Sequence, residues 1–167
     1  MSNSLWSDIF KLNKKDDILD ILKSIPVFKG LSRFDLLKVN KLLHLRRYKA
    51  GETIFLENEP GESMYIIKSG KVKITKKNKK EELCLAILEK GSFFGEVSLV
   101  DEEPRSATAT AMVDLEILGF FRADLMHLID RDPRLASFIL FHLSTVLGKR
   151  LRTLSERFES INYVTES

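Results

Sequence analysis

The residues best suited to binding a small anion lie between positions 94 and 108. Gly95 and Glu96 stand where a loop would enter a helix, and Arg105 follows nine positions after the glutamate. Backbone N–H groups at the start of a helix attract anions, and an arginine adds charge-assisted hydrogen bonds to a phosphate. Glu96 would repel that phosphate, but it can accept hydrogen bonds from a sugar hydroxyl. The pattern therefore predicts a ligand that carries both groups.

Each of these residues also has a simpler explanation. Gly95 can be an ordinary turn glycine, since glycine adopts positive φ without a steric cost. Glu96 and Arg105 can form a surface ion pair that contributes ~0–1 kcal/mol. Taken together with the glycines upstream, however, the residues favour a binding site.

The run from Phe94 to Thr108 resembles the phosphate-binding cassette of the cyclic nucleotide-binding domain family, the domain of catabolite activator proteins and protein kinase A regulatory subunits. It has Gly-Glu, a small residue two positions after the glutamate, and Arg-Ser-Ala-Thr after an acidic loop. Residues 50–53 (AGET) and 64–70 (MYIIKSG) also resemble family phrases. Asn58 stands where the family has glycine, and asparagine tolerates the left-handed conformation. The resemblance covers about 30–158.

This resemblance implies a role for each residue of the cassette. Glu96 would accept a hydrogen bond from the ribose hydroxyl, and Arg105 would bind the phosphate. Backbone N–H groups near Gly95 and Ser98 would point at the same phosphate. Ser106 would reach the phosphate or an edge of the base.

The resemblance also implies an apolar floor and a lid for the base. Ile74 and Leu85 fall where the floor would be, although such residues at a spacing of two are also typical of plain core. The last helix offers four residues for the lid: Arg150, Leu151, Thr153 and Leu154. A leucine would cover the base, and an arginine would stack on it.

Apolar residues recur at helical spacing at both ends of the chain. Helices are predicted over residues 5–25, 33–43, 124–129 and 133–159. Pro26 ends the first, Ser32 caps the second, and Asp132 caps the last, with Pro133 at its first position. The last helix carries an apolar stripe whose spacing approaches a heptad seam: Leu140, Leu147, Leu151, Leu154 and Phe158.

Between these helices, short β-rich runs alternate with glycines. Strands are predicted over 42–48, 53–56, 63–69, 71–77, 82–89, 106–112 and 114–120. Turn signals about every ten residues indicate an antiparallel sandwich or barrel, and the two strands that flank Gly70 are expected to form a hairpin. The family resemblance implies a mainly β fold with flanking helices (α+β): an antiparallel eight-stranded jelly roll with N-terminal helices and a long C-terminal helix. Residues 1–29 would be a helical extension, 30–159 the domain and 160–167 a tail.

Composition is that of one globular domain. The chain has 167 residues, of which 44% are hydrophobic. A single cysteine, Cys84, rules out an internal disulfide and suits a reducing compartment such as the cytoplasm. Met1 to Lys15 lacks the apolar region of a signal peptide. No stretch approaches 18 apolar residues, so no membrane span is expected.

Charge and histidine placement weigh against other classes of function. The net charge of +3 is too small to indicate a nucleic-acid binder. The lysines between Lys71 and Lys80 indicate either a solvated edge strand or an anionic partner. A cupin-type metal enzyme needs clustered ligands, but His44, His127 and His142 are scattered, and no nucleophile–base pair is evident.

The sequence therefore predicts a non-catalytic cytoplasmic receptor for a cyclic nucleotide, with no cofactor, that signals through its last helix. The resemblance favours cAMP over cGMP, because Arg-Ser-Ala also occurs in cAMP-binding bacterial relatives. A homodimer is expected through the half of the helix beyond Gly148. About eight residues follow the predicted helix, too few for a helix-turn-helix domain, so an unidentified effector protein is expected. A cyclic dinucleotide, an interaction module without ligand, and the sensor part of a larger regulator remain alternatives.

Overall fold

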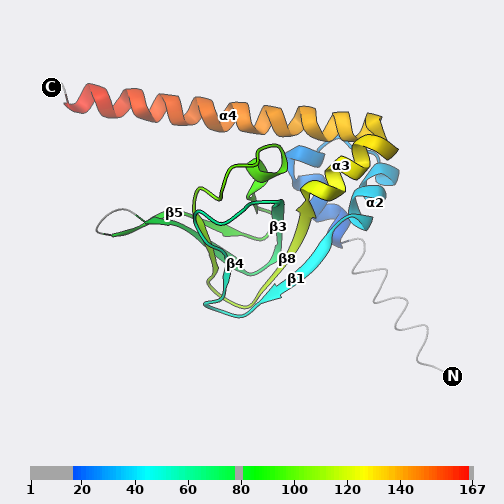
Figure 1. Cartoon of the computed structure of the whole chain (residues 1–167), viewed down its shortest axis with the longest axis horizontal. Coiled ribbons are helices and arrows are strands. Elements are labelled where there is room, and N and C mark those ends of the chain that lie inside the picture. The colour runs from blue at the N-terminus through cyan, green and yellow to red at the C-terminus, as the bar shows by residue number, and fades with distance from the viewer. Residues whose placement is uncertain (1–16, 78–80, 166–167) are drawn as a thin grey trace.

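The computed structural model describes residues 17–77 and 81–165, with side chains up to residue 156. Its strands form two four-stranded antiparallel sheets, ordered β1-β8-β3-β6 and β2-β7-β4-β5. Their bounds are β1 (His44–Tyr48), β2 (Thr53–Phe55), β3 (Ser63–Ser69), β4 (Lys71–Lys77), β5 (Glu82–Glu89), β6 (Phe93–Phe94), β7 (Thr108–Ala111) and β8 (Leu115–Phe121). This is the predicted eight-stranded jelly roll (Figure 1).

Helices cover the outer face of the β1-β8-β3-β6 sheet. They comprise residues 17–24, η1 (Pro26–Phe28), α2 (Arg33–Lys41), α3 (Arg122–Arg131) and α4 (Pro133–Thr165), with a short 3-10 helix, η2 (Glu96–Leu99), in the cassette. Side chains alternate between the two faces of a strand, so β3 serves two cores. Met64 and Ile66 pack against the helices, whereas Tyr65 and Ile67 pack between the sheets.

Local signals predicted the ends of several elements. Ser32 Oγ accepts a hydrogen bond from Asp35 N at 3.1 Å, and Asp132 Oδ1 accepts one from Leu135 N at 3.1 Å, so both predicted caps are confirmed. Asn58 adopts a φ of 69°, as expected of asparagine at a left-handed turn. Of the predicted first helix, the part from residue 17 lies within the described residues and is helical to residue 24.

Two predictions about connections and bounds are wrong, and one strand was not predicted. β3 pairs with β6 and β8, and β4 pairs with β5 and β7, so the strands flanking Gly70 form no hairpin. Gly70, at φ 95°, instead carries the chain from one sheet to the other. The two-residue strand β6 is too short for a periodic signal and was missed. α4 continues to Thr165, so the predicted tail from 160 begins inside the helix.

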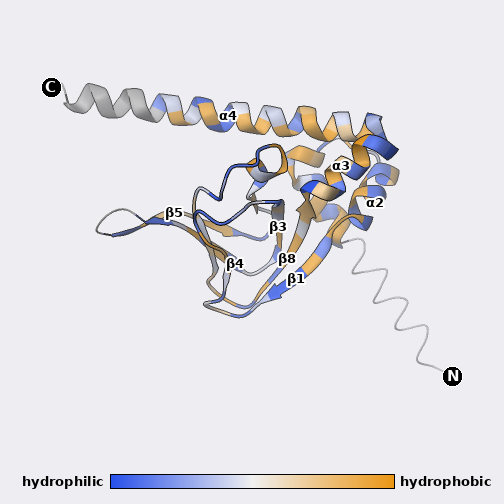
Figure 2. Cartoon of the chain, in the orientation of Figure 1, coloured by the Kyte–Doolittle hydropathy of each residue, from blue (hydrophilic) through white to orange (hydrophobic). Residues whose placement is uncertain are grey.

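The first half of α4 belongs to the core. Its buried residues are Leu135, Ala136, Ile139, Leu143 and Val146. The residues of the predicted apolar stripe have different surroundings. Leu140 and Leu147 pack against that core, whereas Leu151 and Leu154 are 66% and 53% exposed. The Phe158 side chain lies outside the described part. Figure 2 shows apolar and polar residues alternating along this amphipathic helix. None of the described helices, α4 included, is long and apolar enough to cross a membrane.

Glu116 on β8 gives the fold a predictable response to acid. It accepts hydrogen bonds from Lys68 Nζ at 2.6 Å and from Arg47 Nε at 2.8 Å, and these bonds lower the pKa of its carboxyl from 4.5 to about 2. The unfolded chain takes up this proton at higher pH. The stabilisation is therefore complete above pH 4.5 and is lost as the pH falls toward 2.

We expect Glu116→Gln to lower the free energy of unfolding at neutral pH by about 1–3 kcal/mol, because it weakens hydrogen bonds to two charged groups. It should also flatten the loss of stability on acidification, measured by urea titration at several pH values. Glu89→Gln is the control, since it removes an exposed pair with Lys71. Equal effects of the two variants would contradict the assignment.

Candidate functional site

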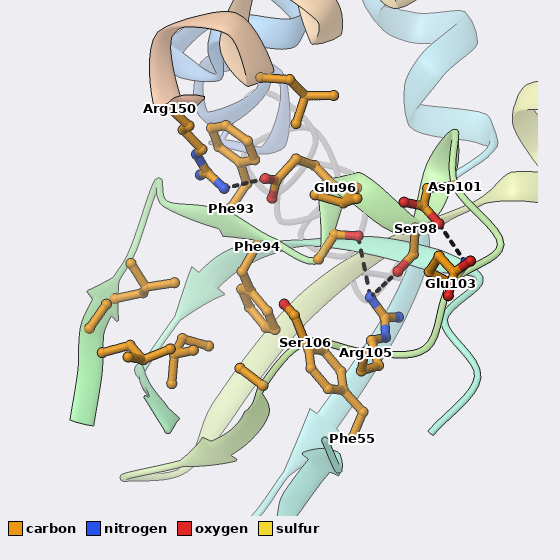
Figure 3. Close-up of a pocket in the computed structure, with 18 of the residues that line it drawn as sticks. Phe55, Phe93, Phe94, Glu96, Ser98, Asp101, Glu103, Arg105, Ser106 and Arg150 are labelled. Atoms are coloured by element: carbon orange, nitrogen blue, oxygen red, sulfur yellow. Dashed lines mark hydrogen bonds and ion pairs between the residues drawn. The ribbon is translucent and has the colours of Figure 1, made fainter. Parts of the chain in front are cut away.

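A cavity of about 610 Å³ opens between the β2-β7-β4-β5 sheet, the segment that leads from β6 to β7, and α4 (Figure 3). It gathers the predicted site residues from five separate places in the sequence: Ile74, Leu85, Gly95, Glu96, Ser98, Arg105, Ser106, Arg150, Leu151 and Leu154. Thr153 is not among the lining residues. Several other lining residues were not predicted from the sequence: Phe55, Leu88, Phe93, Phe94, Asp101 and Glu103.

Arg105 lies buried in this cavity, with 6% of its surface exposed. Its Nη1 donates to Ser63 O at 2.9 Å and to Ser98 Oγ at 3.1 Å, and its Nη2 donates to Ser63 Oγ at 3.0 Å. The Phe55 ring lies 4.1 Å from Cζ, so one face of the guanidinium stacks on an aromatic ring. The aromatic partner was missed because Phe55 precedes Arg105 by fifty positions.

The charge of Arg105 has no counterion among the described residues. Every hydrogen bond that it makes goes to a neutral oxygen, and its buried Nε has no acceptor. Burial lowers the pKa of this guanidinium, while Tyr65 and Glu96 act in the opposite direction. A buried charge without a partner is costly, so this end of the cavity favours an anionic ligand.

Gly95 is the residue that lets Arg105 reach this position. It adopts a φ of 72° at the start of η2, and a Cβ there would lie 2.6 Å from Arg105 Nη1. Glycine is therefore required both by the backbone and by the arginine. The expected helix start is confirmed, because η2 begins at Glu96 with Gly95 as its N-cap, although it is a 3-10 helix of four residues. The dipole of so short a helix is small, so Arg105 is expected to supply most of the attraction for an anion.

Glu96 is 2% exposed and accepts a hydrogen bond from Arg150 Nη1 of α4. Arg150 also lies over Phe93, with Cζ 5.1 Å from the ring centre. The alternative of a surface pair between Glu96 and Arg105 is therefore wrong. Figure 3 shows the Glu96–Arg150 pair at the side of the cavity nearest α4, apart from Arg105. The carboxylate thus joins the cassette to the last helix.

Apolar residues line the remaining walls. Ile74 packs against the core between the sheets and also lines the cavity. It is therefore both a core residue and part of the cavity wall. Leu85 is 49% exposed, which rules out plain core for this residue. Leu151 and Leu154 approach from α4 and are more than half exposed. A flat apolar group placed in the cavity would cover these surfaces.

The lysines of the β4–β5 hairpin lie beside glutamates. Lys71 lies 2.7 Å from Glu89, Lys73 lies 3.8 Å from Glu82, and Lys76 lies 4.0 Å from Glu57. These pairs favour a solvated strand over a surface for an anionic partner. Lys79 and Lys80 lie outside the described residues.

The chain is similar in sequence to proteins of known family. The chain is 34% identical over 143 residues to a cyclic AMP receptor protein of Thermus thermophilus, and it is 34% identical over 110 residues to a cAMP-dependent protein kinase regulatory subunit of Eremothecium gossypii. These alignments cover 85% and 66% of this chain, but 64% and 23% of the relatives. The chain thus spans less than two thirds of either relative.

The fold is also shared with a solved structure. The Thermus thermophilus catabolite activator protein superposes with a TM-score of 0.75 at 34% identity, over 82% of this chain and 63% of that one. The family model of the cyclic nucleotide-binding domain matches residues 45–132, which is more than half of the chain. That range includes the cassette with Glu96 and Arg105. The chain therefore belongs to the cyclic nucleotide-binding domain family.

Proposed function

We propose that this chain is a non-catalytic cytoplasmic receptor module that binds cAMP in the cavity described above. The observation that carries the proposal is Arg105, a buried guanidinium with no counterion among the described residues and an unpartnered Nε. A phosphate would supply the missing negative charge and acceptor. The names of the two relatives, a cyclic AMP receptor protein and a cAMP-dependent kinase regulatory subunit, support cAMP as the nucleotide.

The other groups of a cyclic nucleotide have matching surfaces. With its phosphate at Arg105, the ligand would present its ribose hydroxyl to Glu96. Its base would lie between the Ile74–Leu85 floor and the leucines of α4. Asp101 and Glu103 lie at the rim near Arg105 (Figure 3). Their charges oppose a second phosphate, which favours a mononucleotide over a cyclic dinucleotide.

Signalling would pass through α4. Glu96 contacts Arg150, and Leu151 and Leu154 line the cavity without being buried. A base held against these leucines would favour positions of α4 in which they cover it. The ligand can shift this equilibrium only by its difference in affinity for the two positions of the helix.

The direct test is a titration of the chain with cAMP, cGMP and a cyclic dinucleotide by calorimetry and thermal shift. We expect cAMP to bind most tightly and, at 100 times its Kd, to add ~2.7 kcal/mol to the free energy of unfolding. Tighter binding of cGMP would overturn the choice of base. If no cyclic nucleotide binds, the proposed function is wrong.

Glu96→Gln should weaken cAMP binding less than loss of Arg105 does, because the amide keeps one acceptor for the ribose hydroxyl. We expect a loss of about three- to tenfold, equivalent to ~1 kcal/mol. Wild type should bind 2′-deoxy-cAMP more weakly than cAMP, and Glu96→Gln should narrow that difference in calorimetry. Glu89→Gln, which removes an exposed carboxylate of β5 that does not line the cavity, is the control. Equal binding of both ligands by wild type would show that Glu96 does not contact the sugar.

A homodimer through the second half of α4 is part of the proposal. The buried residues of α4 end at Val146, whereas Leu151 and Leu154 are exposed. Large exposed apolar residues gathered on one helix often mark an interface. Truncation after Gly148 should give a monomer in light scattering and should weaken cAMP binding, because it also removes the lid. A full-length chain that is monomeric at high micromolar concentration would contradict the dimer.

A further inference from the structure

Arg122, the first residue of α3, makes a set of contacts that the ligand site described above does not include. Its Nε and Nη2 each lie 3.1 Å from Ser98 O, and Nη2 lies 3.0 Å from Gly61 O. Nη2 also donates to Asp101 O, and Nη1 lies 3.2 Å from a carboxylate oxygen of Glu102. The side chain is 20% exposed. One guanidinium thus holds carbonyl groups from two separate segments of the chain.

These carbonyls need a donor from outside their own segments. The last carbonyls of a helix have no partner within it, and Ser98 lies in the final turn of η2, which ends at Leu99. Asp101 lies just beyond, and Gly61 belongs to the connection between β2 and β3. Arginine suits this place because its planar guanidinium offers several donors in fixed directions.

The segments that Arg122 joins are the ones that hold Arg105. Ser98 Oγ accepts a hydrogen bond from Arg105, while the carbonyl of the same residue accepts from Arg122. Gly61 packs so closely that a Cβ there would collide with Ser98 Oγ and lie 3.1 Å from Arg105 Cδ. Ser98 therefore lies between two arginines, one inside the cavity and one behind it.

Arg122 also connects this region to the helices. It begins α3, and α3 contacts both η2 and α4. Its backbone N–H donates to Glu62 O at 2.7 Å, which fixes the start of α3 beside the same β2–β3 connection. A displacement of the Ser98–Asp101 segment would therefore be opposed by the anchored end of α3.

We propose that Arg122 is a positioning residue for the anion site: by clamping Ser98, Asp101 and Gly61 from behind, it keeps Arg105 and Glu96 in their binding geometry. The effect on ligand affinity rests on the proposed function, but the effect on the ligand-free cassette does not. Arg122 itself contacts no ligand in this arrangement, because it does not line the cavity.

The test uses Arg122→Gln, Arg122→Lys and the control Arg131→Gln, which removes the same charge from the exposed last turn of α3. In the ligand-free chain, hydrogen–deuterium exchange of amides in 96–105 should accelerate about tenfold in Arg122→Gln, a change of 1.4 kcal/mol. It should accelerate less in Arg122→Lys, which keeps the charge but offers fewer fixed donors. The control should match wild type.

Binding of cAMP by calorimetry provides the second measurement. Affinity should fall about tenfold in Arg122→Gln, recover partly in Arg122→Lys and stay unchanged in Arg131→Gln. Unchanged exchange in 96–105, or exchange that accelerates equally in β3 and β8, would overturn the clamp. Failure of wild type to bind cAMP would overturn the proposed function instead, and the exchange measurements would still decide the role of Arg122.

Discussion

Replacement of Arg105 by alanine is expected to weaken cAMP binding by roughly 30-fold or more, while the fold is retained. Removing one partner of a buried, hydrogen-bonded charge pair costs ~2–5 kcal/mol, and 30-fold corresponds to about 2 kcal/mol. The ligand-free chain should lose much less stability, since the same substitution also removes a buried charge that has no counterion among the described residues. Calorimetry with cAMP and urea unfolding of the free protein measure the two effects.

Two further variants sharpen this result. Arg105→Lys keeps a positive charge but cannot reproduce the fork of donors to Ser63 and Ser98, so its affinity should fall between wild type and Arg105→Ala. Arg46→Ala is the matched control, because Arg46 is exposed on β1 and does not line the cavity. Unchanged affinity for cAMP in Arg105→Ala would show that Arg105 does not bind the phosphate.

Gly95→Ala should also abolish most binding, through geometry rather than charge. The new Cβ would lie 2.6 Å from Arg105 Nη1 and 3.0 Å from Ser63 O, so the guanidinium must move. A left-handed backbone costs a non-glycine residue roughly 1–2 kcal/mol. We expect cAMP affinity to fall at least tenfold, equivalent to about 1.4 kcal/mol, together with a loss of stability in urea unfolding.

Gly51→Ala separates the two causes. Gly51 has a similar φ of 85°, but a Cβ there would meet nothing within 4 Å. It should therefore lose similar stability from the backbone and keep full affinity for cAMP. If both variants bind cAMP equally well, the close approach of Gly95 to Arg105 has no role in ligand binding.

The sequence predicted most of the local structure, because the relevant signals lie within a few residues of each other. Capping by Ser32 and Asp132 depends on a hydroxyl or carboxylate placed three residues before an amide. Strands such as β4 and β5 follow from alternation and flanking glycines, and their predicted bounds match the structure. The cassette was found because Gly95, Glu96 and Arg105 lie in one short segment.

Sheet pairing could not be predicted in the same way. β3 and β4 are adjacent in sequence, yet each pairs with strands from elsewhere in the chain. Gly70 alone connects these two strands, and a glycine between two β-rich runs indicates a hairpin. Burial of both faces of β3 instead favours a place between β6 and β8. That preference depends on two cores that form only when the chain is folded.

The sequence by itself determined that a glycine, a carboxylate and an arginine suited to a phosphate and a sugar occupy one segment. Only the tertiary structure decided that Arg105 is buried without a counterion among the described residues, that Glu96 pairs with Arg150, and that Arg122 holds the cassette from behind. The physical reason is that burial and charge pairing depend on which distant segments exclude water from a side chain. Spacing along the chain carries no information about that exclusion.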